Sequence, residues 1–338
     1  MKYGIILWPH ANARYQTESA RLARAELSIM LRNICPTAAV AEEMRSDINM
    51  LIFDTENELS SAQISRIAGH SLMYAMFEIH GEMLKPVCGR PEAYVGADLP
   101  GILKYKGKTN EQFTDMVINT ALYSSAFAEK GNERLKFVDP MCSRGTSLFL
   151  ALNRGWDADG VDIDGADIRE MNQFFKRYLE YHRIKHTSDK KSFTIKNSKP
   201  VTATEYVFSN TPENYKSGNT ARLRFAECDC GKLTGLFGKK KYHIMISDLP
   251  YGVQHSAGKE SFEALLRRVI PVWKDALIPG GAVALSFNTN TIKPALLREI
   301  MESSGLTVMQ GGEYDGFAHW VEQAVTRDIA VAVRPADS

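Results

Sequence analysis

The chain has 338 residues, and its 41 basic and 40 acidic residues nearly balance, so no overall charge marks it as a nucleic-acid-binding protein. This length allows one large α/β domain with a smaller companion, and no apolar run is long enough for a signal peptide or a membrane span. Five scattered cysteines lack the spacing of a disulfide scaffold or a zinc site, which predicts a reduced, cytoplasmic protein without a metal.

The first part of the chain, 1–92, predicts a small α+β domain. Its pattern is strand, helix, strand, strand, helix, strand, with strands near 3–8, 49–55 and 72–79. Apolar residues of 19–34, including Leu27, Leu31 and Ile34, share one helical face. This order is typical of a ferredoxin-like split βαβ unit. Glycines and prolines from Pro86 to Pro100 predict a linker behind it.

The segment 93–130 is predicted to hold the linker and a helix that begins near Asn110, with Thr109 or Asn110 as its N-cap. From 131 to 338 strands and helices alternate, which predicts a mostly parallel, doubly wound sheet. The late strand at 327–334 is expected to be antiparallel, because no clear helix separates it from the strand-like 306–312.

An insertion at about 186–220 is longer than a simple crossover needs. It is rich in lysine and poor in acids, and Lys185 precedes it directly. Two interpretations are open. One is a solvated excursion, and the other is a basic arm that contacts phosphates.

Four aspartates come at or near the ends of successive predicted strands: Asp139, Asp162, Asp229 and Asp248. Parallel strands place their carboxyl ends at one sheet edge, where ligands of open α/β sheets bind. After Asp139 a small-residue loop with Gly145 leads into a helix near Thr146, which offers main-chain amides to a polar ligand. Asp162 follows about twenty residues later, at the position of a ribose-binding acid. Asp164 is expected to cap the next helix instead.

Such a row of acids suits a nucleoside with free ribose hydroxyls and a cationic amino-acid group, which describes S-adenosylmethionine (SAM). The three spaced glycines of a dinucleotide site are absent, which argues against NAD.

The stretch Asp248-Leu249-Pro250-Tyr251-Gly252 follows a buried strand and suits an exocyclic amine as methyl acceptor. The lone pair of such an amine is delocalised into the base. Acceptors at the Asp248 carboxylate and the Leu249 carbonyl would hold its N–H groups and aim that lone pair at the methyl carbon, with Pro250 stiffening the loop. Tyr251 offers a ring for stacking the base, worth about 1–3 kcal/mol.

These stretches resemble the class I SAM-dependent methyltransferases, and within them the THUMP-associated tRNA guanine-N2 group. The resemblance covers about 105–288 and rests on "YKGKTNEQFTDMVINTAL", "DPMCSRGTSLFLAL…GVDID" and "SDLPYG". It implies a Rossmann-like seven-stranded sheet with an antiparallel last strand, RNA methylation and tRNA processing. The family usually has glycine at the position of Ser143 and serine at that of Arg144.

The resemblance also implies roles for single residues. Asp139 and the Gly145 loop would hold the methionine end, Asp162 the ribose, Asp229 the adenine, and Asp248 to Tyr251 the target base. The implied catalytic residues are Asp248, Leu249, Pro250 and Tyr251, and the implied cofactor-binding residues are Asp139, Cys142, Gly145, Thr146, Asp162, Ile163, Cys228, Asp229 and Asp248.

The predicted function is therefore SAM-dependent methylation of an exocyclic amine, with guanine N2 in tRNA or another structured RNA favoured and DNA a less favoured partner. The domain of 1–92 is a candidate RNA-binding domain. One alternative is an adenine-N6 DNA or RNA methyltransferase, because the loop recognises an amine and not one base. A protein-glutamine methyltransferase and a non-catalytic nucleic-acid-binding module of the same fold are further alternatives.

Overall fold

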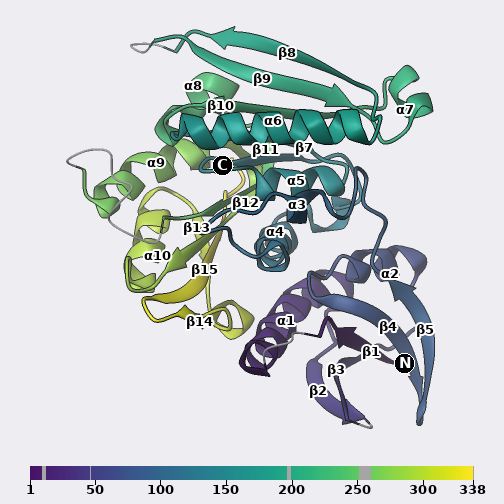
Figure 1. The fold of residues 1–338 in the computed structure, drawn as a ribbon. Helices are drawn as coiled ribbons and strands as arrows, with labels where there is room; N and C mark the ends of the chain where they lie inside the picture. Colours follow the sequence, from purple (N-terminus) through teal and green to yellow (C-terminus); the bar gives the residue numbers. More distant parts are fainter. Residues whose placement is uncertain (10–12, 46, 196–198, 251–259, 338) are drawn as a thin grey trace. The chain divides into compact units, whose positions relative to one another are not determined.

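A computed structural model describes residues 1–9, 13–45, 47–195, 199–250 and 260–337 (Figure 1). The chain divides into two compact units. The first contains Met1–Glu92 together with Gln310–His319, and the second contains Ala93–Met309 together with Trp320–Ser338. The sequence-based boundaries did not assign 310–319 to the N-terminal unit.

The N-terminal unit is an antiparallel sheet with two helices, and its strand order is β2-β3-β1-β4-β5. Tyr3 and Ile5 of β1 are buried, in line with the predicted apolar strand. The prediction of a linker from Pro86 onward was wrong at its start, because Pro86 pairs with Phe77 in β5. The elements are β1 (Lys2–Leu7), α1 (Ala13–Ile34), β2 (Val40–Arg45), β3 (Ile48–Asp54), α2 (Ser61–Ala68), β4 (Met73–His80), β5 (Met83–Gly89) and η4 (Gly312–Asp315).

The larger unit is an α/β fold around one mixed sheet, as predicted. The strand order is β13-β15-β12-β11-β6-β7-β10-β9-β8, with β14 paired to β15. Its strands are β6 (Lys136–Asp139), β7 (Asp157–Asp162), β8 (His186–Phe193), β9 (Val201–Phe208), β10 (Ala221–Glu227), β11 (Tyr242–Asp248), β12 (Leu277–Asn288), β13 (Thr307–Met309), β14 (His319–Glu322) and β15 (Val325–Val333).

The longer helices cross between these strands. Asn110 caps α4 by accepting hydrogen bonds from Gln112 and Phe113. Asp164 caps α6 in the same way, as its position predicted. The helices are α3 (Leu99–Ile102), α4 (Glu111–Ser124), η1 (Ala128–Lys130), α5 (Thr146–Asn153), α6 (Gly165–Tyr181), α7 (Pro212–Lys216), η2 (Cys230–Lys232), α8 (Leu233–Phe237), α9 (Phe262–Ala276) and α10 (Pro294–Ser303).

The central strands β12, β11, β6, β7 and β10 are parallel, and β15 is antiparallel to β12, so the antiparallel last strand is confirmed. The sheet is larger than the seven strands expected. Within the predicted insertion, β8 and β9 pair as a hairpin, and β9 pairs with β10, so the hairpin extends the sheet (Figure 1).

Apolar contacts hold the hairpin in place. The lysine-rich composition of this segment did not predict them. The rings of Tyr206 and Phe208 in β9 pack against Phe175 of α6, at centroid distances of 5.3 and 5.6 Å. Near the other end, the Ile195 side chain packs beside Gly235 of α8. Strand β8 lies at the sheet edge, and its residues between His186 and Phe193 are exposed, so only β9 shows the apolar alternation of a half-buried strand.

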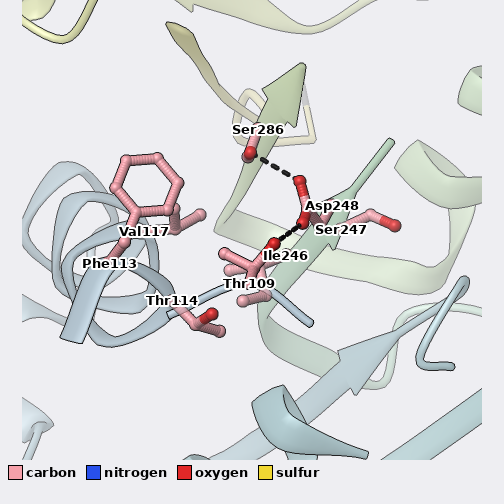
Figure 2. A pocket seen from close by; sticks show the side chains of 8 residues that line it. All are labelled: Thr109, Phe113, Thr114, Val117, Ile246, Ser247, Asp248 and Ser286. Carbon is pink, nitrogen blue, oxygen red and sulfur yellow. Dashed lines mark hydrogen bonds between the residues drawn. The ribbon is translucent and has the colours of Figure 1, made fainter. Parts of the chain in front are cut away.

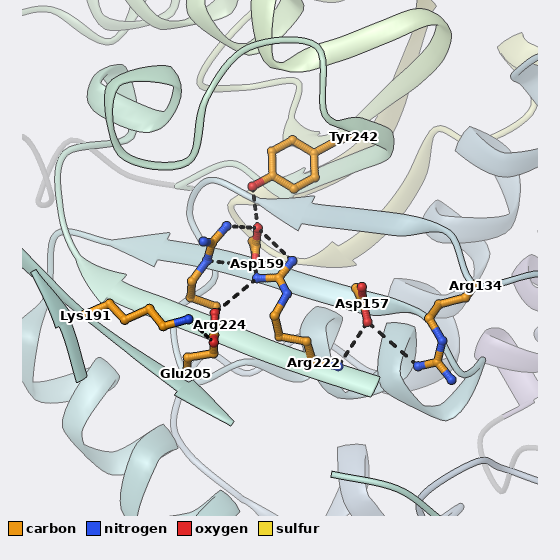
Figure 3. Close-up of polar contacts among 8 residues, drawn as sticks. All are labelled: Arg134, Asp157, Asp159, Lys191, Glu205, Arg222, Arg224 and Tyr242. Atoms are coloured by element: carbon orange, nitrogen blue, oxygen red, sulfur yellow. Dashed lines mark hydrogen bonds and ion pairs between the residues drawn. The ribbon is translucent and has the colours of Figure 1, made fainter. Parts of the chain in front are cut away.

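A buried charge cluster joins the hairpin to the parallel strands (Figure 3). Asp159 of β7 is 1% exposed and accepts hydrogen bonds from Arg222 and Arg224 of β10, each at 2.6 Å, and from the Tyr242 hydroxyl at 2.5 Å. Burial would raise the pKa of Asp159, but the two guanidinium groups hold it below its ordinary value. Arg222 also lies 3.9 Å from Glu205 of β9.

Candidate active site

The carboxyl ends of the parallel strands place the predicted acids along one edge of the sheet. Asp139 ends β6, Asp162 ends β7 and Asp248 ends β11, and these strands are neighbours or next neighbours. Asp229 lies two residues beyond the end of β10, whose last residue is Glu227. Glu227 pairs in register with Asp162, so the edge carries one more acid than the four predicted.

Asp139 is buried behind the loop that follows it. Its carboxylate accepts hydrogen bonds from the Met141 amide at 2.9 Å, the Ser147 hydroxyl at 2.5 Å and the Ser247 hydroxyl at 3.3 Å. Burial raises the pKa of Asp139 to about 7, although these donors oppose the shift. The geometry therefore makes Asp139 the group that shapes the loop 140–146 from inside.

The loop itself has two residues in the left-handed region, Ser143 at φ 45° and Gly145 at φ 87°. A Cβ on Gly145 would lie 2.3 Å from the Met171 sulfur, so glycine is required there on two grounds. Ser143 occupies a conformation that favours glycine, and its hydroxyl donates to Asp167 at 2.7 Å. That hydrogen bond offsets part of the backbone strain.

Asp162 is oriented by main-chain amides. Ser143 N–H donates to its Oδ2 at 2.7 Å, and Asp164 N–H donates to its Oδ1 at 2.9 Å. Burial raises its pKa, opposed by these amides. Because each carboxylate oxygen has a second lone pair, the group can still accept from two ribose hydroxyls. The neighbouring Ile163 is 65% exposed and offers an apolar surface beside it.

Cys142 and Cys228 contribute to this edge through their backbones. Cys142 N–H donates to the Val161 carbonyl at 3.0 Å, and Cys228 N–H donates to the Asp162 carbonyl at 2.8 Å. Both side chains are buried, and burial raises the pKa of each thiol. They pack the site, and neither is positioned as a thiolate nucleophile. Thr146 is the first residue of α5, and its hydroxyl lies 3.5 Å from the Tyr105 hydroxyl.

Asp229, the predicted adenine acceptor, is engaged by a cation. Its carboxylate accepts from the Gly231 amide at 2.6 Å and from Arg268 of α9 at 3.1 and 3.4 Å. Burial would raise the pKa of Asp229, but Arg268 and the Gly231 amide together hold it below its ordinary value. Arg268 also donates to both oxygens of Glu260 at 3.1 Å. Sequence inspection did not identify Arg268.

Asp248 at the end of β11 is held by two hydroxyl groups (Figure 2). Ser286 of β12 donates to its Oδ1 at 2.6 Å, and Thr109, just before α4, donates to its Oδ2 at 2.5 Å. Leu249 is buried, and its amide donates to the Ser286 carbonyl at 2.8 Å, which directs the start of the loop. Pro250 follows, whereas Tyr251 and Gly252 lie outside the described residues.

A small cavity of about 10 Å³ lies beside this carboxylate, room for about one water molecule. Phe113 and Val117 of α4 form one of its walls (Figure 2). Its lining residues are Thr109, Phe113, Thr114, Val117, Ile246, Ser247, Asp248 and Ser286.

Thr109, Ser286 and Arg327 belong to the described surroundings of Asp248, and none was assigned this role from the sequence. Arg327 of β15 donates to Thr109 at 3.3 Å and stacks over the Phe113 ring at 4.8 Å from its centroid. These residues are 38 to 218 positions from their partners, so no local motif links them. The only local signal was the expected helix start at Thr109 or Asn110.

No family model matches the chain, and no curated protein matches it. Among solved structures it is similar to magnesium protoporphyrin IX methyltransferase from Synechocystis PCC 6803 with bound SAM, at 17% identity and a TM-score of 0.41 over 68% of this chain and 86% of that one. It is also similar to a methyltransferase from Pyrococcus furiosus, at 14% identity and a TM-score of 0.41 over 69% and 88% of the two chains.

A third similar structure is an N1-methyltransferase from Burkholderia thailandensis that acts on 1,6-didemethyltoxoflavin, solved with S-adenosylhomocysteine. Its identity is 12% and its TM-score 0.35, over 60% of this chain and 72% of that one.

The described helices include none whose length and apolar character would let it cross a membrane. The same residues contain no group of three His, Cys, Asp or Glu side chains that could hold a metal ion.

Proposed function

We propose that this protein is a SAM-dependent methyltransferase that methylates an exocyclic amine of a nucleobase, with guanine N2 in tRNA or another structured RNA as the substrate. One observation supports it above the others. The carboxylate of Asp248 and the loop between β6 and α5 lie at the same edge of one sheet, on adjacent parallel strands.

The residues at this edge fit the proposed cofactor. Asp162 presents an oriented carboxylate for a ribose, and Ile163 presents an exposed apolar side chain next to it. The left-handed residues Ser143 and Gly145 turn the main chain sharply just before the N-terminus of α5, and a helix N-terminus suits a carboxylate. Asp229 is the proposed acceptor for the adenine amine, which would share it with Arg268. When bound, the cofactor supplies an electrophilic methyl group on a sulfonium.

The proposed role of Asp248 is to bind and orient the acceptor amine. Ser286 of β12 and Thr109, just before α4, each donate to one oxygen of the carboxylate. The two hydroxyl groups fix the plane of the carboxylate, so the amine meets an acceptor that is already ordered. Once methylated, the nitrogen is cationic and acidic, and Asp248 is in place to accept its proton.

The remaining predictions stay part of this proposal. The strand order β2-β3-β1-β4 with two intervening helices supports a ferredoxin-like assignment of the N-terminal unit, with β5 as an addition. We propose RNA binding for that unit. Adenine N6 in RNA or DNA is the second candidate substrate, because Asp248 would accept from that amine equally well.

The decisive experiment uses the full chain with methyl-labelled SAM and separate pools of tRNA, rRNA and DNA, followed by nucleoside mass spectrometry. Label in N2-methylguanosine supports the proposal, and label in N6-methyladenine selects the second candidate. The variant Asp248→Ala should abolish transfer while calorimetry still detects SAM binding. If SAM does not bind and Asp162→Ala changes nothing, a non-catalytic binding module is the better description.

A further inference from the structure

We infer that the end of α6 and the adjoining strand β8 form a docking surface for the phosphate backbone of a structured RNA. The inference rests on the proposed RNA substrate and says where that RNA is held. The surface, named here the α6–β8 patch, consists of Arg177, Tyr181, Arg183, Lys185 and Lys190, all of which are exposed.

The cations of the α6–β8 patch are available. Three acids are near the patch: Glu180 lies 3.8 Å from Lys176, Glu205 lies 2.5 Å from Lys191, and the exposed Asp189 precedes Lys190 in β8. Within the described residues, no acid lies at ion-pair distance from Arg177, Arg183, Lys185 or Lys190. A cluster of cations without internal partners is the electrostatic requirement for binding phosphates.

An aromatic ring stands among these cations. Tyr181 is 83% exposed, and its only described ring neighbour is the edge of His182 at a centroid distance of 5.0 Å. Arg177 is four residues earlier in α6 and therefore lies on the same helix face. An exposed ring beside cations suits an unpaired base stacked next to its own phosphate.

Arg183 has a backbone conformation that favours glycine. The Ile184 amide donates to the Leu179 carbonyl at 2.9 Å, which closes a Schellman turn and leaves Arg183 left-handed at φ 54°. Glycine is the residue that this position favours, because an L side chain is strained there. Within the described residues, Arg183 makes no ion pair that would compensate for the strain. An arginine therefore stands at a position whose backbone favours glycine.

The position of the patch limits the partner. Helix α6 starts directly after Asp164 at the acidic edge and runs for 17 residues, so its far end lies about 25 Å away. An RNA that reaches both places must be at least that long and keep its shape over that distance. A folded RNA such as a tRNA can contact both places at once, whereas an RNA of two or three nucleotides cannot span that distance.

The test measures binding of end-labelled tRNA to the full-length protein by fluorescence anisotropy, without SAM, at several salt concentrations. The triple variant Arg177→Ala/Lys185→Ala/Lys190→Ala should bind at least about 10-fold more weakly. It should also show a shallower salt dependence, by about 0.7–0.9 in the logarithmic slope for each phosphate that is no longer neutralised. Lys293→Ala, an exposed lysine elsewhere, is the control and should bind as the unaltered protein does.

Arg183→Gly separates binding from folding. It relieves the left-handed strain, so its melting temperature should equal or exceed that of the unaltered protein, while its tRNA affinity falls severalfold. Unchanged tRNA affinity in both the triple variant and Arg183→Gly would overturn the inference. So would patch-dependent binding to phosphatidylserine vesicles without patch-dependent binding to tRNA, because the surface would then serve a membrane.

These results are distinguishable from failure of the proposed function. Patch-dependent tRNA binding without methylation of any nucleic acid would overturn the methyltransferase proposal alone. Methylation of tRNA with an unchanged KM and affinity in the triple variant would overturn the docking surface alone. A trinucleotide that contains the target base cannot reach the patch, so its KM should be the same for the triple variant and the unaltered protein.

Discussion

The hydroxyl of Thr109 donates a 2.5 Å hydrogen bond to Oδ2 of Asp248, across 139 positions of sequence. This hydrogen bond joins the residue before the N-cap of α4 to the carboxyl end of β11. Arg327 of β15 donates to the same Thr109 oxygen at 3.3 Å, so this strand helps to position the Thr109 hydroxyl. Under the proposed function, Thr109 positions the carboxylate that binds the acceptor amine.

Thr109→Val keeps the shape of the side chain and removes the hydroxyl, so we expect kcat to fall by about 10- to 100-fold. A hydrogen bond to a charged group is worth about 1.5–3 kcal/mol, which converts to that range. Thr109→Ser keeps the donor and should retain most of the activity. Steady-state kinetics with the RNA substrate are the measurement. Equal kcat values for Thr109→Val, Thr109→Ser and the unaltered protein would show that Thr109 has no role in the site.

Asp162→Ala should weaken SAM binding by about 10- to 100-fold, because charge-assisted hydrogen bonds to the ribose are removed. Isothermal titration calorimetry is the measurement. Asp164→Ala is the matched control two residues away, since Asp164 caps α6. It should lower stability by about 1 kcal/mol and leave SAM affinity unchanged. Equal effects of both substitutions on affinity would mean that the loop, and not the ribose contact, is being measured.

The titration of Asp139 should lower the free energy of unfolding as the pH rises from about 4 to about 7. Burial raises the pKa of this carboxyl to about 7 in the folded state, whereas the unfolded value is about 3.9. The folded state then binds more protons than the unfolded state between these values, and stability decreases with pH. Urea denaturation measures the free energy of unfolding at pH 5 and at pH 8. The difference between these two values should be smaller for Asp139→Asn than for the unaltered protein. An identical pH dependence of the variant would contradict this assignment.

Asp159→Ala should lower the free energy of unfolding by about 3–5 kcal/mol, because Arg222 and Arg224 would lose their buried counter-charge. Asp157→Ala, two residues earlier in β7, is the comparison variant and should lower the free energy of unfolding by less. Arg134 lies 3.8 Å from Asp157, which is more exposed than Asp159. Chemical denaturation compares the two variants. Similar losses of stability for both would mean that the cluster in Figure 3 does not anchor the hairpin β8–β9.

The alternation of strands and helices in this chain was enough to predict an α/β sheet with an antiparallel late strand, because hydrophobic periodicity is a local property. Strand ends at Asp139 and Asp248 were predicted for the same reason, since each comes at the end of a mainly apolar strand, whereas Asp162 was predicted from its spacing behind the Gly145 loop. The caps Asn110 and Asp164 were equally local, as a cap bonds to amides two or three residues away.

Other features depended on which distant segments meet. The lysine-rich insertion became the hairpin β8–β9 because the rings of Tyr206 and Phe208 find Phe175 of α6, a contact that no local pattern encodes. Strand order brought Ser286 and Thr109 to Asp248, and helix α9 brought Arg268 to Asp229. Sequence alone thus identified the carboxylates, whereas the tertiary structure decided their hydrogen-bond partners, because those donors come from segments joined only by folding.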